Sequence, residues 1–358
     1  MNLSQKAPER NPNLDLIRVV AVFSVISVHF FLNNGFYQQP VAGARMFVMI
    51  TMRTAFMVCV PLFMLLTGFL CCRKTLTKKY YAGILPVLEI YLLCSLACLL
   101  FRVLYMKESF SFFSALLAIL DFSACSYSWY VNLYIGLFLL IPFLNLIYNG
   151  LDGRTQKRIL VLSFCFLTAM PSLFNLKYQL IPNWWQGFYP LTFYFIGAYI
   201  REFDVYIRPG KTFLLLSASV LLFGALNYLF NTPNIFSWEG YTDWGSFENV
   251  IDSVLLFLFL LHIRTDSWPL SFHRVLSRLS RISFGIYLSS VISDSVLYPI
   301  LNRKIPYMTD RLPFYFLIVP ASFLMSALIS QVLYWIAQPF DRWFKARFFR
   351  REESIAAS

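Results

Sequence analysis

The stretch NLDLIRVVAVFSVISVHFFLN, residues 13–33, decides the fold of this chain of 358 residues. It is an apolar run long enough to cross a membrane as one helix, with Arg18 near its start and His29 deep inside. An α-helix turns about 100° and rises about 1.5 Å per residue, so these two side chains lie within roughly 20° of each other and about 16 Å apart along the axis. Lipid disfavours both groups, so this face is expected to point into protein or a water-filled cavity. The alternative is an arginine that reaches lipid headgroups and a histidine that only packs.

The composition indicates a polytopic membrane protein. Hydrophobic residues make up 58% of the sequence and charged residues 13%, against about 25% charged residues in ordinary soluble domains. The net charge of +12 lies in short basic patches between apolar runs, a pattern typical of cytoplasmic loops that does not indicate nucleic-acid binding. The seven cysteines form no CxxC pair and no metal-ligand spacing with histidine, so we expect packing residues and no metal site.

Ten apolar runs are expected to span the membrane, which predicts an all-α, polytopic helical bundle. The expected spans are about 13–33, 54–72, 83–105, 128–148, 157–175, 184–200, 212–230, 247–263, 281–301 and 313–337. With the N-terminus in the cytoplasm, the cytoplasmic segments hold 21 Lys and Arg residues and the outer connections hold 5. The positive-inside rule therefore places both termini in the cytoplasm. We expect an N-terminal cytoplasmic tail over 1–12, a membrane domain over 13–340 and a basic cytoplasmic tail over 341–358.

Two outer features lie between the spans. Residues 110–120 are apolar but too short to cross a membrane, so an interfacial or re-entrant helix is expected there. Trp238 and Trp244 fall near the predicted outer surface and are expected to belong to an aromatic belt at the membrane interface.

A second informative stretch is VPLFMLLTGFL, residues 60–70. The pair Thr67-Gly68 predicts that another helix approaches closely. Four cations follow this stretch at the predicted cytoplasmic surface: Arg73, Lys74, Lys78 and Lys79. They can hold phosphate groups through charge-assisted hydrogen bonds, although simple membrane topology also explains them.

Several stretches taken together resemble a known family. They are residues 13–33, 60–70, 126–144 (SYSWYVNLYIGLFLLIPFL), 193–200 (FYFIGAYI) and 280–288 (SRISFGIYL), in this order along the chain. This succession resembles the membrane acyltransferase-3 family, which includes bacterial O-acetyltransferases of surface polysaccharides and peptidoglycan. The likeness covers essentially the whole chain, in the short form without a fused esterase-like domain.

The resemblance implies roles for particular residues. His29 would be the catalytic residue, and Arg18 would serve acyl-CoA at the cytoplasmic side together with the Arg73–Lys79 cluster. Relatives often carry a second histidine shortly after the Gly-Ile-Tyr motif, and here Ser289 and Ser290 stand in that place.

The expected function is transfer of an acyl group from cytoplasmic acyl-CoA to a hydroxyl of a cell-envelope glycan or glycolipid. The acyl group is expected to be acetyl. The expected location is a bacterial inner membrane, and the expected partners are acyl-CoA, the glycan acceptor and the bilayer. His29 acts in this hypothesis as a base or as a transient acyl carrier.

Three alternatives stay open from the sequence. A transporter or lipid flippase predicts repeated halves, which we do not find. A polysaccharide polymerase or glycosyltransferase predicts acidic residues in a sizeable outer loop, and such residues are few. An acyltransferase-like sensor without activity is consistent with the missing second histidine.

Overall fold

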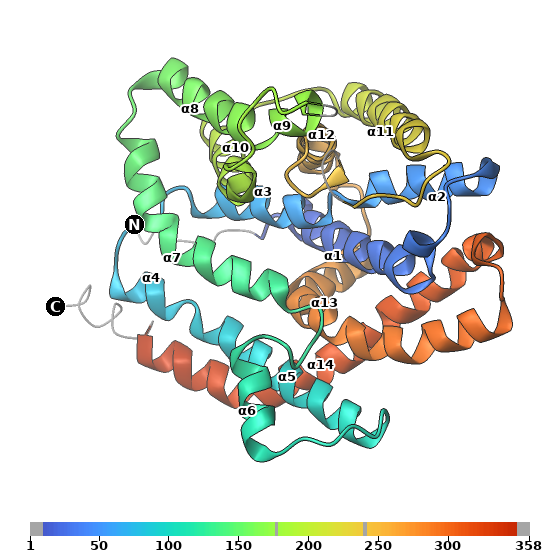
Figure 1. Ribbon diagram of the computed structural model, residues 1–358. Coiled ribbons are helices and arrows are strands. Elements are labelled where there is room, and N and C mark those ends of the chain that lie inside the picture. The colour runs from blue at the N-terminus through green and yellow to red at the C-terminus, as the bar shows by residue number, and fades with distance from the viewer. Residues whose placement is uncertain (1–9, 176–177, 239–241, 349–358) are drawn as a thin grey trace.

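The computed structural model describes residues 10–175, 178–238 and 242–348, and the elements within this part are helices (Figure 1). The helices are α1 Pro12–Asn33, α2 Gly43–Phe56, α3 Cys59–Cys71, α4 Lys78–Ala82, α5 Leu85–Leu104, α6 Phe112–Leu120, α7 Trp129–Asn149, α8 Gly153–Thr168, α9 Met170–Phe174, α10 Tyr189–Phe203, α11 Pro209–Asn231, α12 Phe247–His262, α13 Leu270–Lys304 and α14 Tyr315–Phe348. Short 3-10 turns complete the set: η1 Phe36–Gln38, η2 Gln186–Phe188 and η4 Met308–Phe314. The predicted all-α class is confirmed.

Seven helical segments of the described chain are long and apolar enough to cross a membrane. They contain α1, α2 with α3, α4 with α5, α7, α11, α13 and α14. The other three expected spans correspond to α8, α10 and α12, with 16, 15 and 16 residues, against about 20 for a typical span. The membrane-protein class therefore holds, and the number of ten spans stays a prediction.

Two boundaries differ from the expectation. The segment expected at 54–72 begins at Gly43, because α2 runs into α3 with only a short break near Met57. At the other end, α14 continues to Phe348. Residues 1–9 and 349–358 of the expected tails lie outside the described residues.

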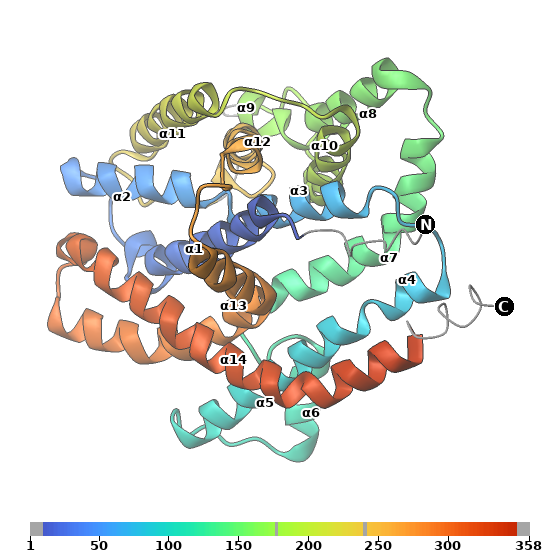
Figure 2. The ribbon, with the colours of Figure 1, turned by 180° about the vertical axis from the view of Figure 1, so that it is seen from behind.

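The first helix, α1, lies at the centre of the bundle (Figures 1 and 2). It packs against α2, α3, α12, α13 and α14. A helix enclosed in this way buries apolar side chains on every side, and Ile17, Val22 and Phe30 are fully buried. This central position brings Arg18 and His29 into the interior of the protein.

The helices α3 and α10 cross at two glycines. A Cβ atom on Gly68 would overlap the carbonyl oxygen of Tyr194, and one on Gly197 would overlap the carbonyl oxygen of Leu65. The close helix approach predicted at Thr67-Gly68 is therefore confirmed. This contact fixes α3 on the side that faces away from α1 and α13.

The α3–α4 connection and the end of α14 lie at the same side of the bundle, on the left in Figure 1 and on the right in Figure 2. That both ends of the chain lie in the cytoplasm stays a prediction. A short helix is present in the 110–120 segment, where α6 covers Phe112–Leu120.

Candidate active site

His29 is paired with a buried carboxylate. Its Nδ1 lies 3.1 Å from Oδ2 of Asp294, which α13 contributes. His29 is 7% exposed and Asp294 is 2% exposed. The other carboxylate oxygen accepts a hydrogen bond from Ser322 at 2.7 Å. A carboxylate beside Nδ1 favours the tautomer with its proton on Nδ1, which leaves Nε2 free to act as a base or nucleophile.

Tyr127 completes the polar cluster around His29. Its hydroxyl donates to Oδ2 of Asp294 at 3.0 Å and accepts a hydrogen bond from Asn33 at 2.9 Å. The Tyr127 ring lies 3.8 Å from the imidazole ring, measured between centroids. Burial, followed by the charge of Asp294, raises the pKa of Tyr127 well above its ordinary value, so the phenol stays a hydrogen-bond donor.

The two serines that follow the Gly-Ile-Tyr motif, Ser289 and Ser290, differ in their surroundings. Ser290 Oγ lies 3.4 Å from Nδ1 of His29 and donates to the carbonyl of Tyr287 at 2.7 Å. Ser289 donates to the carbonyl of Ser326 at 3.1 Å. Ser290 therefore faces His29, but Asp294 is the closer partner of the imidazole.

His29 lines a cavity of about 440 Å³, which we call the His29 cavity. Its volume is within the range of ordinary small-molecule sites. Trp238 and Trp244, expected in a belt at the membrane interface, lie in the wall of this cavity together with Trp129. The rings of Trp129 and Trp244 stack at 5.7 Å. These tryptophans therefore contribute to the cavity that holds His29, which sequence position alone does not reveal.

Arg18 lines a second cavity of about 360 Å³, the Arg18 cavity, with Thr67 and Cys71 among its other lining residues. Arg18 lies 3.4 Å from Asp15, and its side chain is 30% exposed. Asp15 is bound more closely by Arg10, at 2.6 Å. The Arg18 guanidinium is therefore only weakly engaged and can bind a group that enters the cavity.

The two cavities adjoin, because Phe63, Tyr130 and Tyr287 line both of them. The prediction that one face of α1 presents Arg18 and His29 to the protein interior is confirmed. The catalytic role of His29 and the carrier-binding role of Arg18 stay predictions at this point.

The Arg73–Lys79 cluster begins in the α3–α4 connection and ends in the first turn of α4, and it follows Cys71, which lies in the wall of the Arg18 cavity. Arg73, Lys74 and Lys78 are exposed. Asn145 fixes this connection, since its side chain donates to the carbonyls of Cys71 and Lys74 at 2.8 and 2.7 Å. The structure therefore places the cluster beside the Arg18 cavity and at the surface.

Asp294 lies in an expected span, and a charged residue there is predicted to pair inward or to line a cavity. The structure confirms the inward pairing, but the partner was not predictable, because His29 is 265 residues away along the chain. Tyr127 gives no comparable signal, because it is one of 21 tyrosines. Only the packing of α1 against α13 brings these groups together.

The fold and the site define a polytopic membrane protein with a buried histidine–carboxylate pair beside two adjoining cavities. The family model described as an acyltransferase domain, that of the acyltransferase-3 family, matches residues 11–334, nearly the whole chain. The chain belongs to this family and is a membrane acyltransferase. Comparisons with curated proteins and with solved structures gave no significant match. His29 and Asp294 both lie within the matched residues.

Proposed function

We propose that this acyltransferase transfers a small acyl group from acyl-CoA to a hydroxyl of a cell-envelope glycan or glycolipid in a bacterial inner membrane. Acetyl is the acyl group that we propose. One observation carries the proposal: His29, which is paired with Asp294, lines a cavity that adjoins a second cavity lined by Arg18. The first cavity supplies a base or nucleophile, and the second supplies a cation for an anionic carrier.

The donor side of the proposal rests on charge. Acyl-CoA carries phosphates, and a guanidinium binds phosphate through paired hydrogen bonds. Arg18 is weakly engaged in its cavity, and the Arg73–Lys79 cluster lies at the neighbouring surface. A carrier held at this side has to extend about 16 Å along α1 to bring its thioester to His29.

At His29 the reaction has two routes, and Nε2 is the reacting atom in both. As a base, Nε2 takes the proton of the acceptor hydroxyl while the oxygen attacks the thioester carbonyl; the C–S bond breaks, and the imidazolium returns the proton to the CoA sulfur. As a nucleophile, Nε2 attacks the carbonyl first, and the C–S bond breaks so that CoA leaves as its thiolate. The acceptor oxygen then takes the acyl group from the ring and loses its proton to water, which balances the charge of the thiolate. Asp294 stabilises the positive ring in either route.

The alternatives are less well supported. Family membership favours acyl transfer over a transporter, a flippase or a polysaccharide polymerase. A sensor without activity is disfavoured because the imidazole retains its carboxylate partner, and the chain thus keeps the groups that either route requires.

The first test follows labelled acetyl-CoA into the lipid and glycan fractions of membranes that contain the wild type or His29→Ala. We expect incorporation by the wild type and a loss of about 10²- to 10⁴-fold in His29→Ala, the usual contribution of a positioned acid–base group. His262→Ala is the matched control, since His262 lies at the end of α12 and bonds the carbonyl of Leu258. Equal incorporation by His29→Ala and wild type contradicts the proposal. An acyl-histidine trapped in the absence of acceptor selects the nucleophilic route.

A further inference from the structure

The boundary between the two cavities consists of three aromatic side chains from three different helices. Phe63 of α3, Tyr130 of α7 and Tyr287 of α13 line both the Arg18 cavity and the His29 cavity. A group that moves from the Arg18 side to His29 has to pass these rings. The packing of these rings therefore determines which groups can move from the Arg18 cavity to the His29 cavity.

The three rings are closely packed. The ring centroids of Phe63 and Tyr130 are 6.0 Å apart, and those of Tyr130 and Tyr287 are 6.0 Å apart with an interplanar angle of 89°. Both distances fall within the range of about 4.5–7 Å that is typical of aromatic pairs in contact. A group that moves from one cavity to the other therefore meets rings that are packed against one another.

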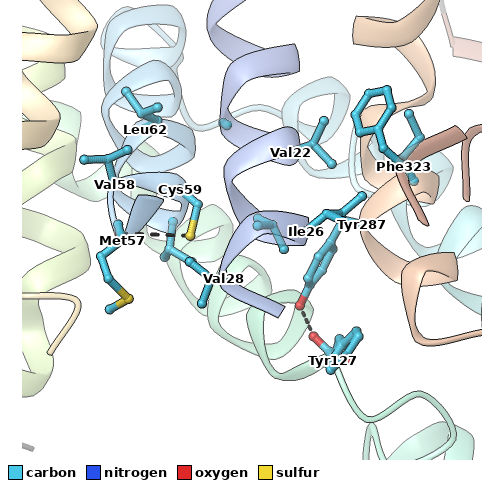
Figure 3. Close-up of a cluster of buried hydrophobic side chains, with 14 of the residues drawn as sticks. Val22, Ile26, Val28, Met57, Val58, Cys59, Leu62, Tyr127, Tyr287 and Phe323 are labelled. Carbon is cyan, nitrogen blue, oxygen red and sulfur yellow. Dashed lines mark hydrogen bonds between the residues drawn. The ribbon is translucent and has the colours of Figure 1, made fainter. Parts of the chain in front are cut away.

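Tyr287 is the fixed member of the three. Its hydroxyl donates a hydrogen bond to the backbone carbonyl of Tyr127 (Figure 3), and the residue is only 6% exposed. Tyr127 in turn binds Asp294. Tyr287 is thus connected by hydrogen bonds to the polar cluster that holds His29. The side chain of Phe63 has no polar atom and is held by packing alone.

We propose that Phe63, Tyr130 and Tyr287 form a constriction that selects acyl groups by their cross-section. This inference rests on the proposed function. The acyl end of the carrier enters the constriction first. A linear acyl chain has the same cross-section as an acetyl group, so both can pass. A chain branched next to the carbonyl is wider at that point and has to displace a packed ring. The structure therefore assigns to these residues a preference for linear over branched acyl groups.

The test compares n-butyryl-CoA with isobutyryl-CoA, which have the same atoms and differ in cross-section, with acetyl-CoA as the reference. We expect the wild type to transfer n-butyryl faster than isobutyryl. In Phe63→Ala, the ratio of isobutyryl to n-butyryl transfer should rise by about tenfold or more, in line with the discrimination that one methyl group provides in a tight site. Phe63→Leu, a smaller change in case the alanine variant is poorly folded, should raise the ratio less.

Phe284→Ala is the matched control, because Phe284 lines the Arg18 cavity but not the His29 cavity. Its ratio should equal that of the wild type. If the wild type transfers acetyl but the ratio of isobutyryl to n-butyryl transfer is the same in Phe63→Ala, Phe63→Leu and wild type, the constriction is contradicted and the proposed function is not. An equal increase in Phe284→Ala also overturns it. Absence of acetyl transfer by the wild type overturns both proposals.

Discussion

At the scale of single residues, Asp294 organises the site. Its Oδ2 accepts a hydrogen bond from Tyr127 and lies 3.1 Å from Nδ1 of His29, and its Oδ1 accepts a hydrogen bond from Ser322. A buried carboxylate is costly unless it is well paired, and here three groups from different parts of the chain provide the pairing. The orientation of the His29 ring thus depends on a residue that does not itself line the cavity.

Asp294→Asn tests this dependence. The amide keeps the shape of the side chain but removes the charge that favours a protonated imidazole, so we expect a fall in kcat of about 10²- to 10⁴-fold by comparison with other histidine–carboxylate pairs. The KM for acetyl-CoA should change little, because the proposed donor site is at Arg18. Ser293→Ala is the control, since Ser293 is next to Asp294 on α13 but forms its hydrogen bond with Ser326 of α14. A variant Asp294→Asn with the kcat of wild type would show that the carboxylate only packs.

At the scale of elements, α3 connects the two cavities. Cys59 and Val60 line the His29 cavity, Thr67 and Cys71 line the Arg18 cavity, and Phe63 lies between them. The opposite side of α3 is held against α10 by the crossing at Gly68 and Gly197. Small residues permit such close helix contacts in membranes, which is why this contact was predictable from Thr67-Gly68, whereas the break between α2 and α3 was not.

Gly68→Ala should destabilise the protein by about 1–3 kcal/mol, because the added methyl group collides with the backbone of α10. Thermal unfolding of the purified protein in detergent measures this effect. Gly136→Ala is the matched control: Gly136 lies in α7, and no atom lies within 4 Å of an added Cβ. That variant should be neutral or more stable by up to about 1 kcal/mol. Equal unfolding midpoints for the two variants would contradict the close crossing.

At the scale of the whole molecule, the sequence predicted the helical membrane class and the interior face of α1 because both follow from apolar length and helical periodicity. It did not predict that His29 meets Asp294, or that Trp238 and Trp244 line the His29 cavity. Those contacts depend on how distant helices and connections pack, and a single sequence carries no signal for that pairing. The lengths of the short helices α8, α10 and α12 also differ from the expectation, because an apolar run predicts the position of a helix better than its length.

We propose that acyl-CoA binds at the Arg18 side, which is predicted to be cytoplasmic, and that its acyl group is used at His29. The most direct test supplies labelled acetyl-CoA, which does not cross bilayers, to inside-out and right-side-out membrane vesicles. We predict incorporation only in inside-out vesicles. There, Arg18→Ala should raise the acetyl-CoA concentration for half-maximal transfer by about ten- to a hundredfold, the loss expected for one charge-assisted hydrogen-bonding group. Equal incorporation in both kinds of vesicle, or an unchanged acetyl-CoA requirement in Arg18→Ala, would contradict the account.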